Sequence, residues 1–86
     1  MGVYEVRWKN SAVKELRKIE SSARVRIADA VGKLSNEPHP NGCKKLRGSL
    51  CTYRIRIGEF RVVYEVESHN KMIIIVRVRH RKEVYK

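Results

Sequence analysis

The segment YRIRIGEFRVVY, residues 53–64, constrains the fold of this chain most tightly. Apolar and basic residues alternate on both sides of Gly58-Glu59, and strict period-2 alternation indicates half-buried β-strands. A two-residue loop that begins with glycine suits a type II′ turn, whose twist matches that of the flanking strands. The sequence therefore predicts a β-hairpin with three facing pairs: Ile57 and Phe60, Arg56 and Arg61, and Ile55 and Val62.

The predicted hairpin places Arg54, Arg56 and Arg61 on one face, which we expect to be open to solvent. Like charges directly opposite each other destabilise a sheet. The face is therefore either a solvated surface with splayed arginines or a surface that binds a polyanion. We favour the polyanion-binding interpretation, because basic residues continue elsewhere in the chain.

Size and charge restrict the possible functions. The 86 residues suffice for one domain with a real but small core. Lys and Arg number 20 against 9 Asp and Glu, so the net charge of +11 indicates an acidic partner such as nucleic acid, an acidic protein or an anionic membrane. A membrane role is disfavoured, because no apolar run approaches the roughly 18 residues of a span and neither predicted helix pairs a strong apolar face with a dominant basic one. The polar N-terminus does not resemble a signal peptide, so we expect a cytoplasmic protein.

The order of predicted elements defines an α+β fold. Apolar periodicity predicts a first strand and two helices, followed by a polar loop and then a basic loop before the hairpin. Asn10 or Ser11 can cap the first helix, and Ser21-Ser22 can cap the second. The last predicted strand is apolar on both faces, as expected of a central strand covered on two sides. We therefore expect the order β-α-α-β-β-β, a small, mainly antiparallel four-stranded sheet with the helical hairpin on one face. The expected ranges are strands 3–8, 50–57, 59–66 and 72–78, helices 10–20 and 21–36, and loops 37–42 and 44–48.

The two cysteines do not form a metal-binding motif. Cys43 and Cys51 have no CxxC spacing, and the three histidines are scattered along the chain. Cys51 is in phase with the apolar face of the hairpin, so we interpret it as core filler and Cys43 as a free loop thiol. We expect neither a metal nor another cofactor.

Three segments resemble a known family. The order KLRG, YRIRIGEFRVVYEV and VRHRKEVYK is similar to the RelE branch of the RelE/ParE toxins of bacterial and archaeal toxin–antitoxin systems. The resemblance covers nearly the whole chain and implies a single RelE-like toxin domain over residues 1–86. It implies an mRNA interferase that enters the ribosomal A site, contacts 16S rRNA and cuts the mRNA. It also implies a cognate acidic antitoxin that silences the toxin.

The resemblance also implies a set of site residues. The basic positions of the hairpin, the arginine after the last strand and the near-terminal tyrosine carry over to this chain, and His80 stands where several relatives have a histidine. The hairpin pair is arginine here, whereas the best-known member has lysine, and Arg79 stands where glycine is common. The expected catalytic residues are Arg56, Arg61, Arg81, Tyr85 and His80. The expected RNA-binding residues are Arg47, Arg54, Lys45 and Arg79, with Lys44 and Lys45 acting mainly through general electrostatics.

Metal-free RNA cleavage needs a base, an acid and positive charge at the phosphate. Guanidinium groups suit the last task, but arginine is a poor proton donor or acceptor because its pKa exceeds about 12. His80 could be the base or acid, or else a substrate contact or structural residue. Tyr85 could contact or stack on the substrate, or pack. Two other functions stay open: a ParE-like toxin that acts on DNA gyrase, and a basic RNA-binding module without catalysis.

Overall fold

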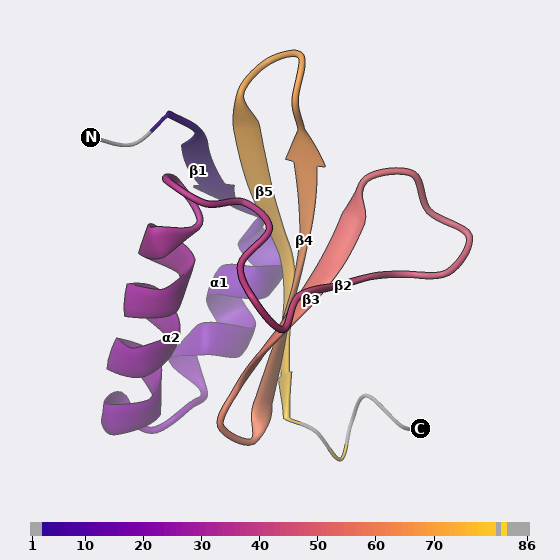
Figure 1. Ribbon diagram of the computed structural model, residues 1–86. Coiled ribbons are helices and arrows are strands. Elements are labelled where there is room, and N and C mark those ends of the chain that lie inside the picture. Colours follow the sequence, from indigo (N-terminus) through magenta and orange to yellow (C-terminus); the bar gives the residue numbers. More distant parts are fainter. Residues whose placement is uncertain (1–2, 81, 83–86) are drawn as a thin grey trace.

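The computed structural model describes residues 3–80 and residue 82, and Figure 1 shows their arrangement. Two helices and five strands are present in these residues, in the predicted α+β order with one short strand added. Their bounds are β1 (Glu5–Trp8), α1 (Asn10–Arg17), α2 (Ser21–Lys33), β2 (Lys44–Lys45), β3 (Thr52–Ile57), β4 (Phe60–Glu67) and β5 (Met72–His80).

The strands form one mostly antiparallel sheet in the order β1-β5-β4-β3-β2. The meander of β3, β4 and β5 confirms the prediction, while β1 pairs parallel with β5. The prediction of four strands is wrong by one, because Lys44 and Lys45 pair with Arg54 and Tyr53 as the fifth strand rather than staying in a loop. A strand of two residues is too short for periodicity to reveal.

The hairpin of β3 and β4 has the predicted register. Its facing pairs include Ile57 with Phe60 and Arg56 with Arg61. Gly58, the first residue of the turn, has φ of +60°. Among the described non-glycine residues only Lys71, outside this turn, has positive φ. Glu59 therefore has negative φ, which fits the predicted type II′ turn and excludes type I′.

The helix ends differ from the predicted ones. Lys9 and Glu20 occupy the N-cap positions, and neither helix has a side-chain cap, so the predicted caps at Asn10 or Ser11 and at Ser21 or Ser22 are wrong. The start of α1 is fixed instead by the backbone of Lys9, whose N–H donates to the Ile75 carbonyl at 2.9 Å. Tertiary hydrogen bonding thus overrides the local capping signal.

Helix α2 ends at Lys33, before the predicted Asn36. The turn that follows is used by the start of the chain, because the Ser35 carbonyl accepts N–H bonds from Val3 and Tyr4 at 3.1 and 3.0 Å. The Ser35 hydroxyl also donates to the Tyr4 carbonyl at 2.7 Å. The end of α2 and the start of β1 are therefore held together.

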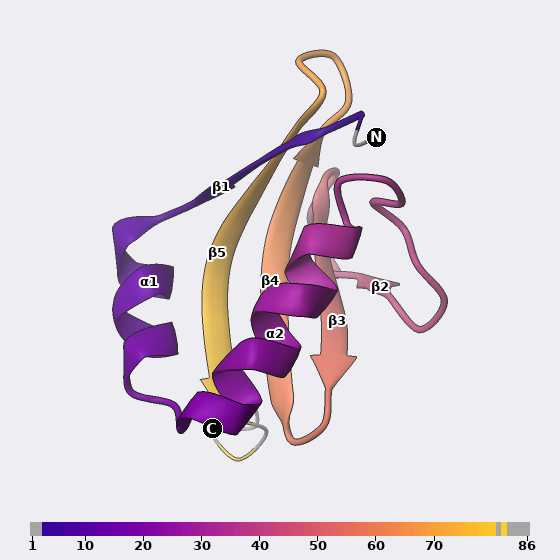
Figure 2. The same ribbon diagram turned by 90° about the vertical axis from the view of Figure 1, so that its left-hand side faces the viewer.

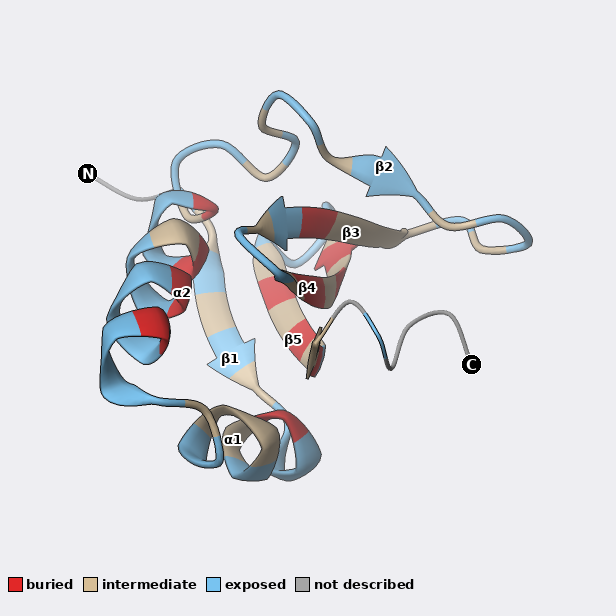
Figure 3. Cartoon of the chain, turned by 90° about the horizontal axis from the view of Figure 1, so that it is seen from below, coloured by how far each residue is buried: buried red, intermediate tan, exposed pale blue. Residues whose placement is uncertain are grey.

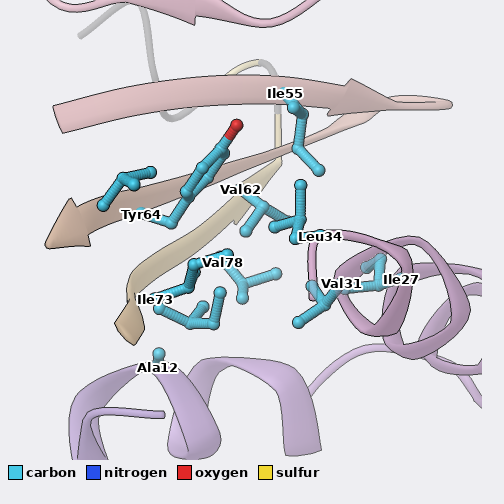
Figure 4. Close-up of a cluster of buried hydrophobic side chains, with 11 residues drawn as sticks. Ala12, Ile27, Val31, Leu34, Ile55, Val62, Tyr64, Ile73 and Val78 are labelled. Carbon is cyan, nitrogen blue, oxygen red and sulfur yellow. The ribbon is translucent and has the colours of Figure 1, made fainter. Parts of the chain in front are cut away.

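Both helices cover the same face of the sheet, as predicted, and Figures 2 and 3 show this layer from two sides. α1 packs on β5, and α2 packs on β3. The core lies between the two layers, and Figure 4 shows its side chains. Its members are Ala12, Ile27, Val31, Leu34, Ile55, Val62, Tyr64, Val66, Ile73, Ile75 and Val78.

Strand β5 lies between β1 and β4, as expected of a central strand. Ile73 and Ile75 are fully buried on the helix side, but Ile74 and Val76 are only half-buried, so the prediction of two covered faces is wrong for the outer face. A register shift between Val63 and Tyr64 changes the pairing with β5. Beyond this bulge the even-numbered residues of β5 face the helices, and the odd-numbered residues face outward.

Candidate nucleic-acid interface

The outer face of the sheet, opposite the helices, carries two rows of cations. Arg56 faces Arg61 across β3 and β4, and Arg61 faces Arg79 across β4 and β5, which gives one row of three arginines. Residues directly opposite each other share a face, so all three side chains leave the sheet on the same side. The second row is formed by the facing residues Lys44, Arg54, Val63 and Arg77.

A hollow of about 240 Å³ opens among the cations of β2, β3 and β4. Among the described residues its lining is Gly42, Lys44, Arg54, Arg56 and Arg61, which are four cations and a glycine without a carboxylate. Arg56 is fixed there by a hydrogen bond from its Nε to the Gly58 carbonyl at 3.3 Å. Its remaining N–H groups can bind an anion, and a guanidinium matches phosphate oxygens bidentately.

Arg61 is the most unusual residue of this hollow. The prediction that it faces solvent is wrong, because only 6% of it is exposed. Its closest hydrogen bond is a long one, 3.5 Å from a terminal nitrogen to the Phe60 carbonyl, and no described carboxylate lies within ion-pair distance.

No described side-chain nitrogen or oxygen is both buried and without a partner, so the free N–H groups of Arg61 must reach the open space of the hollow. A cation that is largely removed from water without a counterion is costly for the fold. The arrangement therefore suits a bound anion.

Glu15 of α1 neutralises the other end of the arginine row. Its Oε2 lies 2.9 Å from Arg79 Nε and 3.6 Å from a terminal nitrogen of Arg77. Its Oε1 accepts the Val78 N–H at 2.9 Å, at the edge of β5 that β1 leaves uncovered beyond Ile75. The net positive charge of the outer face is therefore concentrated at the hollow.

Aromatic rings hold the loop that forms one wall of the hollow. Tyr64 donates from its hydroxyl to the Pro38 carbonyl at 2.7 Å and stacks on Tyr53, with ring centroids 6.0 Å apart. Tyr53 in turn contacts His39 edge-on at 4.6 Å. Both tyrosines point to the core side, as predicted. Burial raises the pKa of Tyr64, with the nearby Cys43 adding to the effect, so the hydroxyl keeps its proton and the hydrogen bond.

His80 lies away from the hollow. It faces Phe60 across the sheet, on the helix side, and the two rings meet edge-to-face at 5.3 Å. Its Nε2 is 3.7 Å from Glu59 Oε2, and its Nδ1 accepts the Lys82 N–H at 3.2 Å. The structure therefore does not bring His80 together with Arg56 and Arg61.

The remaining predicted site residues divide into two groups. Lys45 faces Tyr53, so its side chain leaves the sheet on the helix side, and Arg47 lies exposed in the connection from β2 to β3. Neither lines the hollow. Arg81 and Tyr85 lie outside the described residues.

Sequence reasoning missed Gly42, the place of Lys44 in the hollow, and the acid at the other end of the arginine row, Glu15. Gly42 and Lys44 line the hollow because β2 pairs with β3. This pairing puts the side chain of Lys44 on the outer face of the sheet and that of Lys45 on the helix side. The signal in the sequence that could have found Glu15 is its charge, because the other charged residues of α1, Lys14 and Arg17, are basic.

The described residues contain no group of three or more His, Cys, Asp or Glu side chains that could hold a metal ion. Both cysteines are free and half-buried, which confirms the prediction of a free thiol for Cys43. The interpretation of Cys51 as core filler is wrong, because Cys43 rather than Cys51 packs against the core. Across the same part of the chain, neither helix has the length and apolar character needed to cross a membrane.

Comparison with known proteins identifies the family to which this chain belongs. Residues 6–85 match the family model of the ParE toxin of the parDE type II toxin–antitoxin system. The chain belongs to this toxin family. Within it, the chain is 33% identical to Toxin RelG of Mycobacterium tuberculosis over 96% of its own length and 97% of that protein. RelE-like toxins are therefore its relatives within the RelE/ParE superfamily, as the sequence segments indicated.

Solved structures of RelE toxins share the fold. A chain of the archaeal RelE–RelB complex from Pyrococcus horikoshii OT3 matches this chain with a TM-score of 0.83 and 30% identity. The match covers 92% of this chain and 96% of that one. The toxin–antitoxin complex RelBE2 from M. tuberculosis matches with a TM-score of 0.80 and 31% identity, covering 94% of each chain. The chain is thus a RelE-like toxin of a type II toxin–antitoxin system.

Proposed function

We propose that this toxin is a metal-independent endoribonuclease that cleaves mRNA in the ribosomal A site and so inhibits translation. The observation that carries the proposal is Arg61, which is buried without a carboxylate partner among the described residues, at a hollow lined by four cations. Such a site fits a phosphodiester, whose charge it would neutralise. The membership of the chain in a toxin family, and its likeness to RelE proteins, supports an RNA rather than a small anion as the ligand.

The hollow can supply two of the contributions that RNA cleavage requires. Arg56 and Arg61 would bind the scissile phosphate and stabilise the negative charge that grows on its oxygens when the 2′-hydroxyl attacks. Lys44 and Arg54 would hold the neighbouring phosphate and fix the strand. A ribosome that presents the mRNA in one conformation would add to the rate by positioning.

The proton transfers fall to residues outside the hollow. Arg81 and Tyr85 follow β5 and remain our candidates for charge stabilisation and for substrate contact or proton transfer. We assign His80 to a structural role, because its ring faces Phe60 on the opposite side of the sheet from Arg61. Arg47, Lys45 and the exposed lysines of the helical layer would contact 16S rRNA.

The same positive charge would attract an acidic antitoxin. The RelE proteins in two of the matched structures are bound to RelB antitoxins. We propose that a cognate antitoxin binds this chain in the cytoplasm and blocks its access to the ribosome.

The test is primer extension on mRNA from a reconstituted translation reaction, with and without ribosomes. We expect wild type to cut at A-site codons only when ribosomes are present. The cleavage rate of Arg61→Ala should be lower by about 100-fold or more. Arg24→Ala is the matched control, because Arg24 is an exposed arginine of α2 in the opposite layer. Absence of cuts by wild type would disprove the proposal, and equal rates for the two variants would remove Arg61 from the site.

A second candidate is a toxin that acts on DNA gyrase, favoured by the ParE description of the matched family model. Cells that express the chain would then accumulate DNA damage while translation continues. Pulse labelling of protein synthesis, together with a DNA-damage reporter, separates the two candidates.

A further inference from the structure

A second cavity lies on the helix side of β3. It has a volume of about 300 Å³ and opens between α2, the loop 37–42 and the end of β3. Its apolar walls are Ala30 of α2, Leu34 directly after α2, Pro40 of the loop, and Ile55 and Ile57 of β3. Small-molecule sites are mostly apolar and range from about 300 to 1,000 Å³. The cavity is therefore large enough for one flat ring system and too small for a packed helix.

This cavity adjoins the cationic hollow. Gly42 and Arg56 line both of them. The reason lies in the sheet, because β2 pairs with β3 only at Tyr53 and Arg54, and the chain diverges from β3 at Gly42, which has φ of +89°. A ligand that binds in the hollow can therefore extend around this open end of the sheet into the cavity.

Polar groups at the rim complement the edge of a nucleobase. Asn41 and Glu37 line the cavity together with Arg56. An amide both donates and accepts hydrogen bonds, and a carboxylate accepts from an exocyclic amine, so these side chains can distinguish one base edge from another. The planar guanidinium of Arg56 can stack on a base.

We propose that the cavity binds the base of the nucleotide whose phosphate occupies the cationic hollow. The proposal rests on the proposed function and deepens it, since it names the part of the RNA that the toxin reads. A protein strand is the weaker alternative, because only Ile55–Ile57 of β3 extend beyond β2 and strand addition relies on a row of main-chain hydrogen bonds.

The experiment is an NMR titration of the isolated, isotope-labelled protein. The probes are inorganic phosphate, ribose 5-phosphate and the four nucleoside 3′-monophosphates. We expect at least one nucleotide to bind about tenfold more tightly than ribose 5-phosphate, which is the scale of one base-stacking contact. Its addition should shift the amide signals of Ala30 and Asn41, which inorganic phosphate should leave in place.

Two substitutions on one helix provide a matched pair. Ala30→Phe fills the cavity, whereas Ala28→Phe adds the same side chain at an exposed position of α2. We expect Ala30→Phe to lose the tenfold preference for the nucleotide while it binds inorganic phosphate as wild type does. Ala28→Phe should keep the preference. If Ala30→Phe does not fold, Asn41→Ala in the surface loop replaces it and should equalise the affinities of the four nucleotides.

Two results would overturn the proposal. One is equal binding of nucleotides and ribose 5-phosphate by wild type, and the other is a preference that survives in Ala30→Phe. Shifts at Ala30 and Asn41 produced only by an acidic peptide would assign the cavity to a protein partner and likewise overturn it. Because no ribosome is present, a failure of mRNA cleavage leaves this result standing, and a failure here leaves the cleavage assay unaffected.

Discussion

Arg61 combines two properties that a stable fold would normally keep apart. It is a permanent cation, and it is 94% removed from solvent without a carboxylate partner in the described structure. Burial of a charge destabilises a protein unless the charge is paired. Such a residue is retained when function needs a preorganised charge, and stability is lost in exchange.

Replacing Arg61 by methionine should therefore separate stability from activity. We expect Arg61→Met to leave the free energy of unfolding unchanged or to raise it by about 1 kcal/mol, because an apolar side chain of similar length fills the space without a desolvated charge. RNA cleavage should fall by about 100-fold or more. Urea denaturation and the primer-extension assay measure the two effects. A loss of stability above about 1 kcal/mol would make Arg61 a structural residue.

Tyr64 should give the fold an alkaline limit. Burial raises its pKa above the ordinary value near 10, so the folded chain holds this proton more tightly than the unfolded chain does. The resulting stability is complete below about pH 10 and is lost as the pH rises further. We expect wild type to be more stable than Tyr64→Phe at pH 8 by about 1 kcal/mol, through the hydrogen bond to Pro38.

Above pH 10 this advantage should shrink by up to about 1.4 kcal/mol per pH unit, because one proton is released on unfolding. Urea denaturation of both proteins from pH 8 to pH 11.5 measures it. An advantage that stays constant over this range would show that the Tyr64 pKa is not raised.

Single residues were predictable from the sequence where alternation alone decides their environment. Alternation placed Ile55, Val62 and Tyr64 in the core and put Arg54 and Arg56 on the opposite face. It could not show that Arg61 is buried on that face, because burial there depends on the surrounding loop and strands rather than on the strand period. It also could not place His80, whose side depends on the bulge between Val63 and Tyr64.

At the scale of secondary-structure elements, the uncovered edge of β5 is the feature that sequence could not reveal. β1 pairs only with Met72–Ile75, and the strand continues to His80. Helix α1 covers the remaining edge through Glu15, which hydrogen-bonds the Val78 N–H and pairs with Arg79. Helix α1 thus supplies the hydrogen-bond acceptor that a neighbouring strand would supply at this edge. It also limits edge-to-edge association with another sheet.

Substitution of Glu15 should weaken the junction of α1 and β5. We expect Glu15→Ala to lower the free energy of unfolding by about 2 kcal/mol, since it leaves the Val78 N–H and two arginines without the carboxylate. Glu15→Gln keeps an oxygen that can accept the Val78 N–H, so its loss should be about half as large. Urea denaturation gives both values, and hydrogen exchange of the Val78 amide reports the edge directly. Equal stabilities of wild type and Glu15→Ala would show that the contact contributes nothing.

The elements themselves were largely predictable, while their ends were not. Long periodic segments gave β3, β4, β5 and both helices. The start of α1 and the end of α2 are set by backbone bonds to residues distant in sequence, namely Lys9 to Ile75 and Val3 to Ser35. Such bonds leave no local pattern.

At the scale of the whole molecule, charge is distributed unevenly over the two layers. The net charge of +11 includes acids that are already engaged with cations of the same chain, such as Glu15 with Arg79 and Asp29 with Lys33. No described acid lines the hollow in the same way. Under the proposed function the overall field would attract RNA at long range, and the hollow would determine where a phosphate is held.

Salt dependence should distinguish the hollow from the general field. If the hollow's four cations contact phosphates, log K for a short single-stranded RNA should fall with log salt concentration with a slope of about −3, at about −0.7 per phosphate. Arg56→Ala should reduce the magnitude of this slope by about 0.7, whereas Lys14→Ala, on the exposed side of α1, should leave it unchanged. Fluorescence anisotropy at several salt concentrations measures the slope. Equal slopes for the two variants would argue against a localised site.

The order of strands in the sheet has a consequence for how this toxin folds during its synthesis. The central strand β5 follows the other described strands and helices along the chain, and both β1 and β4 pair with it. A nascent chain that stops before Met72 should therefore lack these two strand pairings and stay open to protease. Limited proteolysis of stalled chains can check this, and protection of such chains would contradict it. The row of Arg56, Arg61 and Arg79 spans β3, β4 and β5, so the row cannot form before β5 has been synthesised and paired.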